Sequence, residues 1–496
     1  MESRVKALAS LLVPIISGAL FVPGLAPMSA WPSTLLSIAA LLYLMHRKSQ
    51  QSAFLIGWLY GVGLFGAGVS WVYVSIQVHG QAPPLLAGTL TALFCLGLAT
   101  LTGLQMALYR RCSRGRKTPS SLLFAAIWVL FEWLRSWLFT GFPWLYAGYI
   151  ALDTPAAGWA PVVGVYGLSF LIAGLSAAIG SLALNTASDL RKRGAEASIW
   201  VIIILTGMPL SAVSWTQDRS APLTVAIYQP NIPLEKKWDR RYFRAIQQQY
   251  TDNSRPYFKN TDLVLWPESA LPTYKDRIED YLSLVATEAT ETGTTLITGI
   301  PTRDAQGGYN SIVALGLGAG EYRKQKLVPF GEYVPFEENL RGLIKFFDLP
   351  MSNFIPGPNV PPILSAGPLK VASFICYEIV YPDFVWQGAR DAALLVTVSN
   401  DSWFGHSIGP LQHLQMARFR ALETGRPLLR GTNNGVSAII DHKGDLLVAT
   451  PQFEEVVITG EVQPKTGLTP LMWLGSTPIL AFCGLLIVAA AYRRQG

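Results

Sequence analysis

Charged side chains are scarce in this chain. Only 14% of its 496 residues are Asp, Glu, Lys or Arg, and half are hydrophobic. Soluble domains carry about 25% charged residues, so this shortage argues against an ordinary soluble protein. The net charge of +7 does not indicate a nucleic-acid partner, because the basic residues form short clusters between apolar runs, a pattern typical of membrane topology.

Cysteine and histidine are also rare. The four cysteines, Cys95, Cys112, Cys376 and Cys483, show no paired spacing of the kind that binds metal. The sequence also lacks a glycine-rich phosphate loop, so we expect no metal and no organic cofactor. The five histidines form no pattern with Cys376, which disfavours a Cys-His dyad but leaves it open.

Long apolar runs, in contrast, are frequent. Most approach the roughly 20 residues that a membrane-spanning helix needs. They lie near 7–25, 31–45, 53–75, 85–109, 121–139, 161–184, 198–215 and 470–492. The first run has no clear small-x-small cleavage site, so we interpret it as a retained span and not as a signal peptide.

Lys and Arg alternate between the loops that join these runs. The loops at 26–30, 76–84 and 140–160 contain neither residue, whereas the other loops and both chain ends carry basic clusters. The positive-inside rule therefore predicts eight spans with the N-terminus in the cytoplasm. Three parts follow: a membrane domain of seven helices (1–215), an extracytoplasmic domain (216–469), and an eighth helix with a cytoplasmic tail (470–496).

Two charged residues lie inside the fifth apolar run. Glu132 and Arg135 are spaced i, i+3 and so share one helix face. Intramembrane charges often mark functional sites, but a mutual ion pair that faces the helix bundle is the commoner outcome. We expect such a structural pair in preference to a substrate role.

Residues 216–469 have a different pattern, in which short β-like runs alternate with amphipathic stretches. This alternation favours a layered α/β domain. The predicted strands are Leu223–Gln229, Leu263–Trp266, Thr295–Gly299, Val371–Cys376, Leu394–Ser399 and Val436–Asp441, and the predicted helices are 240–254, 278–292 and 411–424.

Cys376 is the single cysteine of this domain. A lone thiol in an oxidising compartment cannot form an internal disulfide, so chemistry is one reason for its presence. A buried core cysteine, which behaves as a small hydrophobic residue, fits equally well.

Two further polar residues stand at the ends of β-like runs, namely Glu268 and Lys324. A carboxylate, an ammonium and a thiol suffice for acyl transfer through a thioester: the carboxylate moves the proton, and the cation stabilises the oxyanion. Glu268 could equally be a helix N-terminal carboxylate, and Lys324 a solvated strand lysine. Lys324 and Lys326 would share a strand face, so spacing does not choose between them.

Four motifs carry a resemblance to a known family. They are Trp266-Pro267-Glu268-Ser269, Lys324-x-x-Leu327-Val328-Pro329-Phe330-Gly331-Glu332, Cys376-Tyr377-Glu378 and Asn400-Asp401-Ser402-Trp403-Phe404-Gly405. The first three resemble the Glu-Lys-Cys triad of the nitrilase superfamily, and the fourth resembles a further block of that group. With seven spans before the domain and one after it, the whole chain is similar to the apolipoprotein N-acyltransferases of Gram-negative bacteria.

This resemblance implies a fold and a reaction. The fold is a four-layer αββα sandwich, and the catalytic lysine is Lys324, eight residues before the glutamate of the Phe-Gly-Glu motif. The enzyme would take an acyl chain from a phospholipid, typically phosphatidylethanolamine, and pass it to the α-amine of a diacylglyceryl-cysteine apolipoprotein. It would work in the inner membrane, with its catalytic domain in the periplasm.

The resemblance also implies roles for individual residues. Cys376 would be the nucleophile, Glu268 the general base, and Lys324, together with a backbone N–H near Tyr377, the oxyanion binder. Glu332 and Glu378 would orient Lys324 or shape the pocket, although Glu378 could instead form a buried salt bridge. Trp238 would bind substrate, but it could equally be a core or exposed aromatic residue.

A lid is a further expectation. Residues 336–347 place Phe336, Leu340, Leu343, Ile344 and Phe347 on one helical face, as a lid that lies on the membrane would do. A helix packed on its own domain would show the same pattern. Arg341, on the other side of this helix, could contact a phosphate or be an ordinary surface arginine.

Two other functions remain open at this point. A membrane-tethered amidase or nitrilase would use the same triad with water as acceptor, although seven preceding spans are excessive for a tether. A transporter or sensor would normally need more polar residues within its spans than Glu132, Arg135 and scattered Ser, Thr and Gln.

Overall fold

The computed structural model describes residues 2–114, 119–184, 190–333 and 353–492. Its chain forms two compact units. The first, here called the helical unit, comprises Met1–Tyr73, Pro83–Ser214 and Leu474–Gly496. The second, here called the sandwich unit, comprises Val74–Ala82 and Trp215–Trp473.

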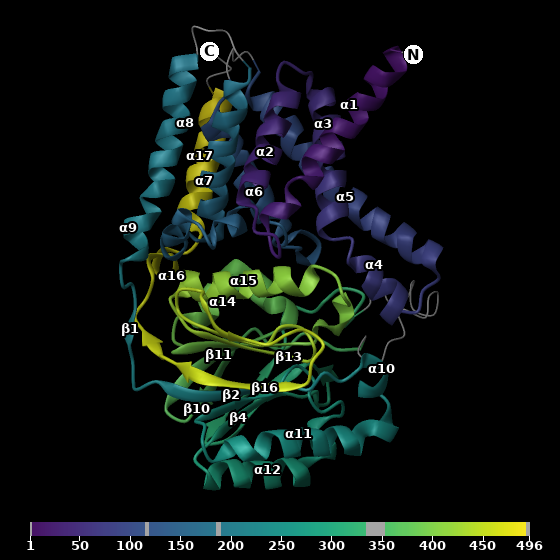
Figure 1. Cartoon of the computed structure of the whole chain (residues 1–496), viewed down its shortest axis with the longest axis vertical. Helices are drawn as coiled ribbons and strands as arrows, with labels where there is room; N and C mark the ends of the chain where they lie inside the picture. The colour runs from purple at the N-terminus through teal and green to yellow at the C-terminus, as the bar shows by residue number, and fades with distance from the viewer. Residues whose placement is uncertain (1, 115–118, 185–189, 334–352, 493–496) are drawn as a thin grey trace. The chain divides into compact units, whose positions relative to one another are not determined.

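Each apolar run of the sequence contains a helix. In the helical unit these are α1 (Glu2–Ala19), α2 (Trp31–Met45), α3 (Gln50–Gly68), α5 (Pro84–Cys112), α6 (Ser121–Arg135), α7 (Ala160–Leu182), α8 (Leu190–Leu205), α9 (Gly207–Ser211) and α17 (Thr477–Tyr492). Although α17 comes last in the sequence, it lies beside α6 and α7 (Figure 1). The C-terminal helix therefore completes the bundle that the N-terminal half begins.

The helices differ in how well they meet the length needed to cross a membrane. Among the described residues, Pro84–Cys112, Pro155–Leu182 and Leu190–Ser211 are long and apolar enough. Gln50–Gly68 together with Val72–His79, bent by 59°, would make a fourth. The apolar helices Leu8–Gly24, Trp31–Met45 and Thr477–Tyr492 are shorter. The structure thus has membrane helices, and the count of eight crossings and their orientation stay predictions.

Small residues bring α1 and α3 close together. A Cβ at Gly18 would lie 1.9 Å from the Tyr60 carbonyl oxygen, so only glycine fits at this crossing. Next to it, the Ser37 hydroxyl of α2 contacts both the Ser17 carbonyl oxygen and the Tyr60 hydroxyl, at 2.5 and 2.7 Å. Close backbone packing and interhelical hydrogen bonds therefore hold these helices together.

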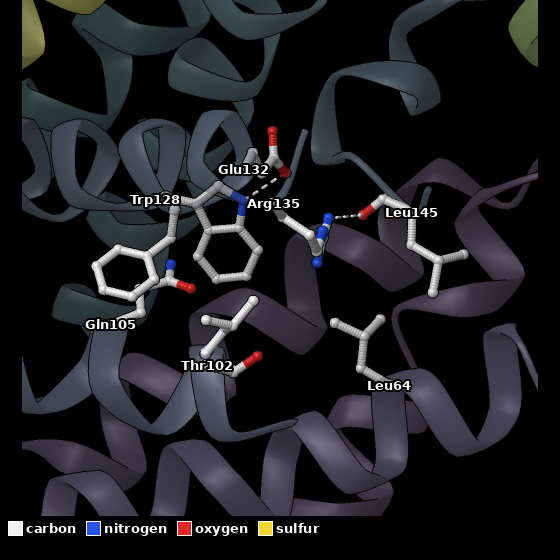
Figure 2. Close-up of a pocket in the computed structure, with 9 residues that line it drawn as sticks. Leu64, Thr102, Gln105, Trp128, Glu132, Arg135 and Leu145 are labelled. Atoms are coloured by element: carbon white, nitrogen blue, oxygen red, sulfur yellow. Dashed lines mark hydrogen bonds between the residues drawn. The ribbon is translucent and has the colours of Figure 1, made fainter. Parts of the chain in front are cut away.

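Glu132 and Arg135 lie at the end of α6, where they line a small pocket with Gln105, Trp128 and other residues (Figure 2). Their predicted mutual ion pair was wrong: no ion pair joins them in the described part of the chain. Glu132 Oε1 instead accepts hydrogen bonds from Trp128 Nε1 and the Ala147 amide, both at 2.8 Å. Arg135 Nη2 donates to the carbonyl oxygen of Trp144, also at 2.8 Å.

The hydrogen-bond partners of Glu132 and Arg135 explain why the predicted ion pair does not form. The i, i+3 spacing brings two side chains to one face, but the segment 144–147 returns to that face and supplies backbone groups that compete for both charges. The chain just before this segment closes the α-helix earlier than the predicted 121–139. The Phe142 amide donates to the Arg135 carbonyl oxygen at 2.7 Å, and α6 ends at Arg135. Both charges therefore fasten α6 to this segment.

Truncation of Glu132 should loosen this fastening. In Glu132→Ala the buried Trp128 and Ala147 N–H groups lose their acceptor, and each orphaned group costs about 1–3 kcal/mol. We expect a clear fall in the thermal unfolding midpoint of the full chain in detergent. Glu132→Gln keeps the Oε1 acceptor and should unfold close to the wild-type temperature. Equal midpoints for Glu132→Ala and wild type would contradict this account.

The sandwich unit contains two large sheets. The seven-stranded sheet has the order β15-β14-β13-β12-β11-β10-β8, and the six-stranded sheet has the order β16-β2-β3-β4-β7-β9. Their strands are β2 (Leu223–Gln229), β3 (Leu263–Leu265), β4 (Thr295–Gly299), β7 (Ser311–Gly316), β8 (Gly318–Ala319), β9 (Glu321–Arg323), β10 (Ile363–Ala366), β11 (Leu369–Ile375), β12 (Leu394–Ser399), β13 (Leu428–Thr432), β14 (Ala438–Ile440), β15 (Leu446–Ala449) and β16 (Val456–Val462).

Helices cover the outer face of each sheet. α11 (Phe243–Phe258) and α12 (Glu279–Glu291) contact the six-stranded sheet, and α14 (Pro382–Ala389) and α15 (Gly409–Thr424) contact the seven-stranded sheet (Figure 1). One apolar core, with Ile227, Leu265 and Val396, lies between the sheets. Another, with Tyr250 and Trp266, lies under α11 and α12. The expected four-layer αββα sandwich is confirmed.

The alternation of side chains along each strand explains the two cores. Leu263 and Leu265 of β3 face the inter-sheet core, whereas Val264 faces the helices. The strands that are buried on both faces consequently read as continuous apolar runs. The predicted strands Leu223–Gln229, Thr295–Gly299 and Leu394–Ser399 match the observed bounds, and the other three differ from them by one or two residues at an end.

A segment from the first half of the sequence also belongs to the sandwich unit. Ser75 and His79 lie in the short π-helix Ser75–His79. The Ser75 hydroxyl donates to the Trp403 carbonyl oxygen at 2.8 Å, and the His79 ring meets the Trp403 ring edge-on at 5.5 Å. The loop predicted at 76–84 is thus packed on the block Asn400–Gly405.

Candidate functional site

Neighbouring parallel strands bring the predicted site residues together. β11 and β12 are parallel, and their register pairs Ile375 with Val398, so Cys376 and Ser399 follow at adjacent positions. In the other sheet β3 is parallel to β2 and β4, and Glu268 stands three residues beyond its end. The carboxyl ends of parallel strands are where α/β folds place ligand sites.

Cys376 occupies a sharp turn between β11 and the 3₁₀ helix Cys376–Val380. Its φ of 51° lies in the left-handed region, which non-glycine residues adopt at an energetic cost. Such strain is typical of functional turns. The turn is held by Glu378, whose Oε2 accepts a hydrogen bond from the Ile375 amide at 2.9 Å.

Glu378 also ties this turn to the lysine segment. Its Oε1 accepts hydrogen bonds from the Tyr322 hydroxyl and the Gln325 amide at 2.7 Å, and from the Lys326 amide at 3.1 Å. Among the described residues these partners are a tyrosine and backbone amides, in place of the salt bridge that sequence reasoning left open. Glu378 therefore fixes the Cys376 turn relative to the segment that carries Lys324.

The ammonium of Lys324 lies among carboxylates. Its Nζ is 2.8 Å from Glu332 Oε2, 2.9 Å from Glu332 Oε1 and 3.8 Å from Glu268 Oε1. Lys324 is only 1% exposed, whereas Lys326 is exposed and lies over the Tyr381 and Phe384 rings. The strand β9 ends at Arg323, so the alternation rule that grouped the two lysines no longer applies to them.

Glu268 is held at both carboxylate oxygens. Its Oε1 accepts a hydrogen bond from Asn310 Nδ2 at 2.7 Å, and its Oε2 accepts one from the Asn400 amide at 2.8 Å. Asn310 Nδ2 also donates to Glu332 Oε1 at 2.7 Å, so this one amide links the two carboxylates. Gly299 makes room for this arrangement, because a Cβ there would lie 2.7 Å from Glu268 Cα.

A second buried lysine supports Glu268 from its backbone. Lys237 is fully buried, and its Nζ donates to the Glu268 carbonyl oxygen at 2.9 Å. Burial lowers the pKa of Lys237 to about 8, although the Glu268 carboxylate partly offsets this by raising it. The chain carries this lysine next to Trp238, at the end of the short helix Leu234–Lys237.

Burial and neighbouring charge set the protonation of the site. Burial raises the pKa of Glu268, and the ammonium of Lys324 lowers it in part. Burial alone would lower the pKa of Lys324, but Glu332 and Glu268 outweigh it and raise the pKa above its ordinary value. Burial and the Glu268 charge raise the pKa of Cys376, and Lys324 opposes them. The resting site therefore holds a thiol beside a permanent ammonium.

A second polar network touches Cys376. The Ser399 hydroxyl lies 3.4 Å from Cys376 Sγ and 2.6 Å from Asp401 Oδ1. Arg430 Nη2 donates to Asp401 Oδ2 at 2.7 Å, and His413 Nε2 lies 3.1 Å from the Cys376 carbonyl oxygen. Ser399, Asp401, His413 and Arg430 are all at most 1% exposed.

Trp238 belongs to a small apolar cluster. Leu327 and Phe354 form its buried part, and Trp238, Tyr333 and Trp403 pack against them. Leu327 stands three residues after Lys324, and Tyr333 directly follows Glu332, so the cluster is continuous with the site in sequence. This position fits the predicted substrate-binding role of Trp238, which stays a prediction.

The remaining predicted residues fall in two groups. Tyr377 follows Cys376, and its ring meets the Tyr381 ring edge-on at 5.2 Å; its role near the oxyanion stays a prediction. Arg341 and the predicted lid at 336–347 lie outside the described residues. Within the described ranges no group of three or more His, Cys, Asp and Glu side chains could hold a metal ion.

Sequence reasoning missed several residues of the site, which are Lys237, Asn310, Ser399, Asp401, His413 and Arg430. One signal was available: Arg430 is a charge inside the apolar strand β13, and a buried charge requires a partner. Asp401 lies in the motif Asn400–Gly405, which was noted without a role. Asn310 and Lys237 carried no signal, because their partners are brought near only by the fold.

Taken together, the αββα sandwich, the buried Glu268 and Lys324 and the half-buried Cys376 at its strand ends define a carbon-nitrogen hydrolase domain. Residues 224–469 match the family model described as "Carbon-nitrogen hydrolase". Residues 17–178 match the model described as "Apolipoprotein N-acyltransferase N-terminal domain". The chain therefore combines a carbon-nitrogen hydrolase domain with the N-terminal domain found in apolipoprotein N-acyltransferases.

Whole-chain comparisons agree with both models. The chain is 45% identical over 495 residues to the apolipoprotein N-acyltransferase of Pseudomonas aeruginosa, covering 98% of this chain and 96% of the relative. It is 37% identical over 515 residues to that of Shewanella oneidensis, covering 100% and 97%. The chain belongs to the apolipoprotein N-acyltransferase family and is an acyltransferase of the membrane.

Solved structures similar to this chain include a CN-hydrolase superfamily protein from Xanthomonas campestris. The identity is 18% and the TM-score 0.38, and the match covers 49% of this chain and 91% of that one. An amidase from Nesterenkonia sp. is 16% identical with a TM-score of 0.37, covering 54% of this chain and 98% of the amidase.

Replacement of Lys237 should change how activity depends on pH. Glu268 must be ionised to accept a proton, and the Lys237 ammonium is one of the charges that lower its pKa. In Lys237→Met the pKa of Glu268 should rise further, so the acid limb of the pH-rate profile should move to higher pH. Above about 8, where wild-type Lys237 itself loses its charge, the two rates should converge.

The measurement is the rate of single-turnover acylation of the enzyme across pH. The exposed neighbour Lys236 provides a matched control, because Lys236→Met removes the same charge type at the surface and should leave the profile unchanged. An acid limb in Lys237→Met that coincides with wild type would refute the coupling between Lys237 and Glu268.

Proposed function

We propose that this enzyme transfers an acyl chain from a membrane phospholipid to the N-terminal α-amine of diacylglyceryl-cysteine apolipoproteins, through a thioester on Cys376. The donor we propose is phosphatidylethanolamine. The product is a triacylated lipoprotein. The observation that carries the proposal is the buried Lys324 ammonium between Glu332 and Glu268, electrostatically coupled to Cys376.

In the first half-reaction, Glu268 takes the proton of Cys376 as Sγ attacks the sn-1 ester carbonyl of the phospholipid. A new C–S bond forms, and the carbonyl oxygen becomes an oxyanion that Lys324 stabilises, with the amide of Tyr377 as a second donor. The C–O bond then breaks. The departing alkoxide of the lysophospholipid takes the proton back from Glu268.

In the second half-reaction, the apolipoprotein amine attacks the thioester and Glu268 accepts its proton. The C–S bond breaks, the amide forms, and the proton returns to Cys376. An α-amino group has a pKa near 8, so a useful fraction is neutral at working pH. Glu268 serves as base and acid in both halves, which leaves the enzyme unchanged after each cycle.

The charge balance of the site supports this sequence. Moving a proton from Cys376 to Glu268 converts one buried anion into another, so the number of buried charges stays constant. Burial penalises each anion, as the raised pKa values of both groups reflect. Because the two penalties oppose one another, the transfer is easier than ionisation of Cys376 into solvent.

We further propose an inner-membrane location with the sandwich unit in the periplasm. The alternation of basic loops supports this orientation, and seven crossings before residue 216 would give it. A periplasmic site can receive lipoproteins after their export. Trp238 and its apolar cluster would then contact the substrate's acyl chains.

The thioester can be detected directly. Incubation of the full chain with phosphatidylethanolamine, without acceptor, should add the mass of one acyl chain that hydroxylamine removes. Cys376→Ser should show no such adduct, since its alcohol is a far weaker nucleophile. Cys112→Ser, which removes a thiol of the helical unit, should still be acylated.

Addition of a diacylglyceryl peptide should discharge the adduct and acylate the peptide. Discharge at the same rate without peptide would indicate that water is the acceptor and would overturn the proposed transfer. Acylation of Cys376→Ser that equals wild type would overturn the role of Cys376.

A further inference from the structure

The network around Ser399 contains more acceptors than its hydroxyl can serve. Ser399 Oγ lies 2.6 Å from Asp401 Oδ1 and 3.4 Å from Cys376 Sγ. A hydroxyl has a single hydrogen to donate, together with two lone pairs that accept. Ser399 can therefore donate to Asp401 or to Sγ, but not to both at once.

The groups around Asp401 fix its charge. Burial would raise the pKa of Asp401. The Arg430 charge and the hydrogen bonds that Asp401 accepts outweigh burial and hold this pKa below its ordinary range. Asp401 is therefore an anion at neutral pH, and it pairs with Arg430 at 2.7 Å. It can release the Ser399 hydrogen without becoming an orphaned charge, since Arg430 remains in place.

His413 is neutral in this arrangement. Burial and Arg430 lower its pKa. Its Nε2 faces the Cys376 carbonyl oxygen, which only accepts, so Nε2 carries the hydrogen and donates at 3.1 Å. Its Nδ1 then accepts from Arg430 Nη2, also at 3.1 Å, and lies 3.2 Å from Asp401 Oδ1. His413 thus anchors the backbone of the nucleophile's turn while Ser399 contacts its sulfur.

We propose that Ser399 is a positioning residue that turns its one hydrogen between Asp401 and Cys376 Sγ during each catalytic cycle. In the resting enzyme Ser399 donates to Asp401, and its oxygen lies 3.4 Å from the neutral Cys376 thiol. When Glu268 takes the thiol proton, the Ser399 hydrogen rotates to the thiolate. No proton changes its covalent partner in this rotation, so it adds no charge to the site.

The rotation is reversed when the thioester forms. A thioester sulfur carries no charge and accepts weakly, so the hydrogen returns to Asp401 and the sulfur is released for the second half-reaction. Ser399 thereby stabilises the thiolate of Cys376 relative to the thiol and to the thioester. This inference rests on the proposed role of Cys376 as nucleophile.

The charges that face Cys376 are those of Glu268, Lys324 and Asp401. Two variants of this network should therefore change the thiolate population in opposite directions. Loss of the Ser399 hydroxyl should disfavour the thiolate, because a hydrogen bond to a charged group is lost. Loss of the Asp401 charge should favour it, because a nearby anion is removed and the Ser399 hydrogen is released to Sγ. General damage to the fold would not move the two variants in opposite directions.

The experiment is alkylation of the full chain in detergent with iodoacetamide at several pH values, with peptide mass spectrometry to isolate Cys376 from the other cysteines. We expect Ser399→Ala to react about tenfold more slowly than wild type at equal pH. Ser399→Thr, which restores a hydroxyl, should recover most of the rate. Asp401→Asn should react faster than wild type.

Ser373→Ala is the matched control. Ser373 is a buried serine of β11, three residues before Cys376, and its hydroxyl has no hydrogen-bond partner in the structure. It should react as wild type does. If Asp401→Asn does not fold, the Ser399→Ala, Ser399→Thr and Ser373→Ala comparison still decides the matter.

Wild-type reactivity of Cys376 in Ser399→Ala would overturn the inference, as would equal slowing in Ser373→Ala. Failure of the proposed function would look different: Cys376→Ser would then retain acyl transfer, whatever the alkylation rates of the other variants.

Discussion

The site depends on a single buried cation. Lys324 has almost no access to solvent, and an isolated ammonium in such a place would lose its proton. Two carboxylates prevent this, one at 2.8 Å and the other at 3.8 Å. They keep the ammonium charged, and the ammonium in turn keeps two neighbouring carboxylates from repelling one another. Neither sign of charge could stay buried here without the other.

The rest of the site can be understood as charge compensation around this cation. Glu268 and Glu332 balance Lys324 and Lys237, and Asn310 donates to both carboxylates. Asp401 is balanced by Arg430 in the second network. Cys376 therefore lies among charged groups that are held by opposite charges or by hydrogen-bond donors, and the proposed proton transfer from sulfur to Glu268 leaves the number of charges unchanged. The strained turn at Cys376 and its anchors, Glu378 and His413, hold the sulfur in place for that transfer.

The fold could be predicted from local pattern to a large extent. Leu223–Gln229 and Leu394–Ser399 are strands because β-branched and apolar residues run without interruption between turn residues, and the structure has the same bounds. Glu268, Lys324 and Cys376 could be named because motifs at strand ends carry them. The structure brings Glu268 to Lys324, and both are coupled electrostatically to Cys376.

What could not be predicted depends on distant contacts. The partners of Glu132 and Arg135 come from the segment 144–147, which no helical spacing rule includes. Strand spacing alone could not separate Lys324 from Lys326, which the family resemblance did, because the rule of alternation does not apply beyond the end of β9 at Arg323. Lys237 and Asn310 lie far from Glu268 in sequence, and only the packing of the sandwich brings their polar atoms to its carboxylate and carbonyl oxygens.

The most direct test of this account is the structure of the acyl-enzyme, formed on the full chain with phosphatidylethanolamine in the absence of acceptor. Lys324 is held in place by Glu332, so it should need no movement to meet the developing oxyanion. We predict a thioester on Cys376 with its carbonyl oxygen within about 3 Å of Lys324 Nζ, and Lys324 still paired with Glu332. A thioester whose carbonyl oxygen points away from Lys324, or an acyl chain on any other residue, would contradict the account.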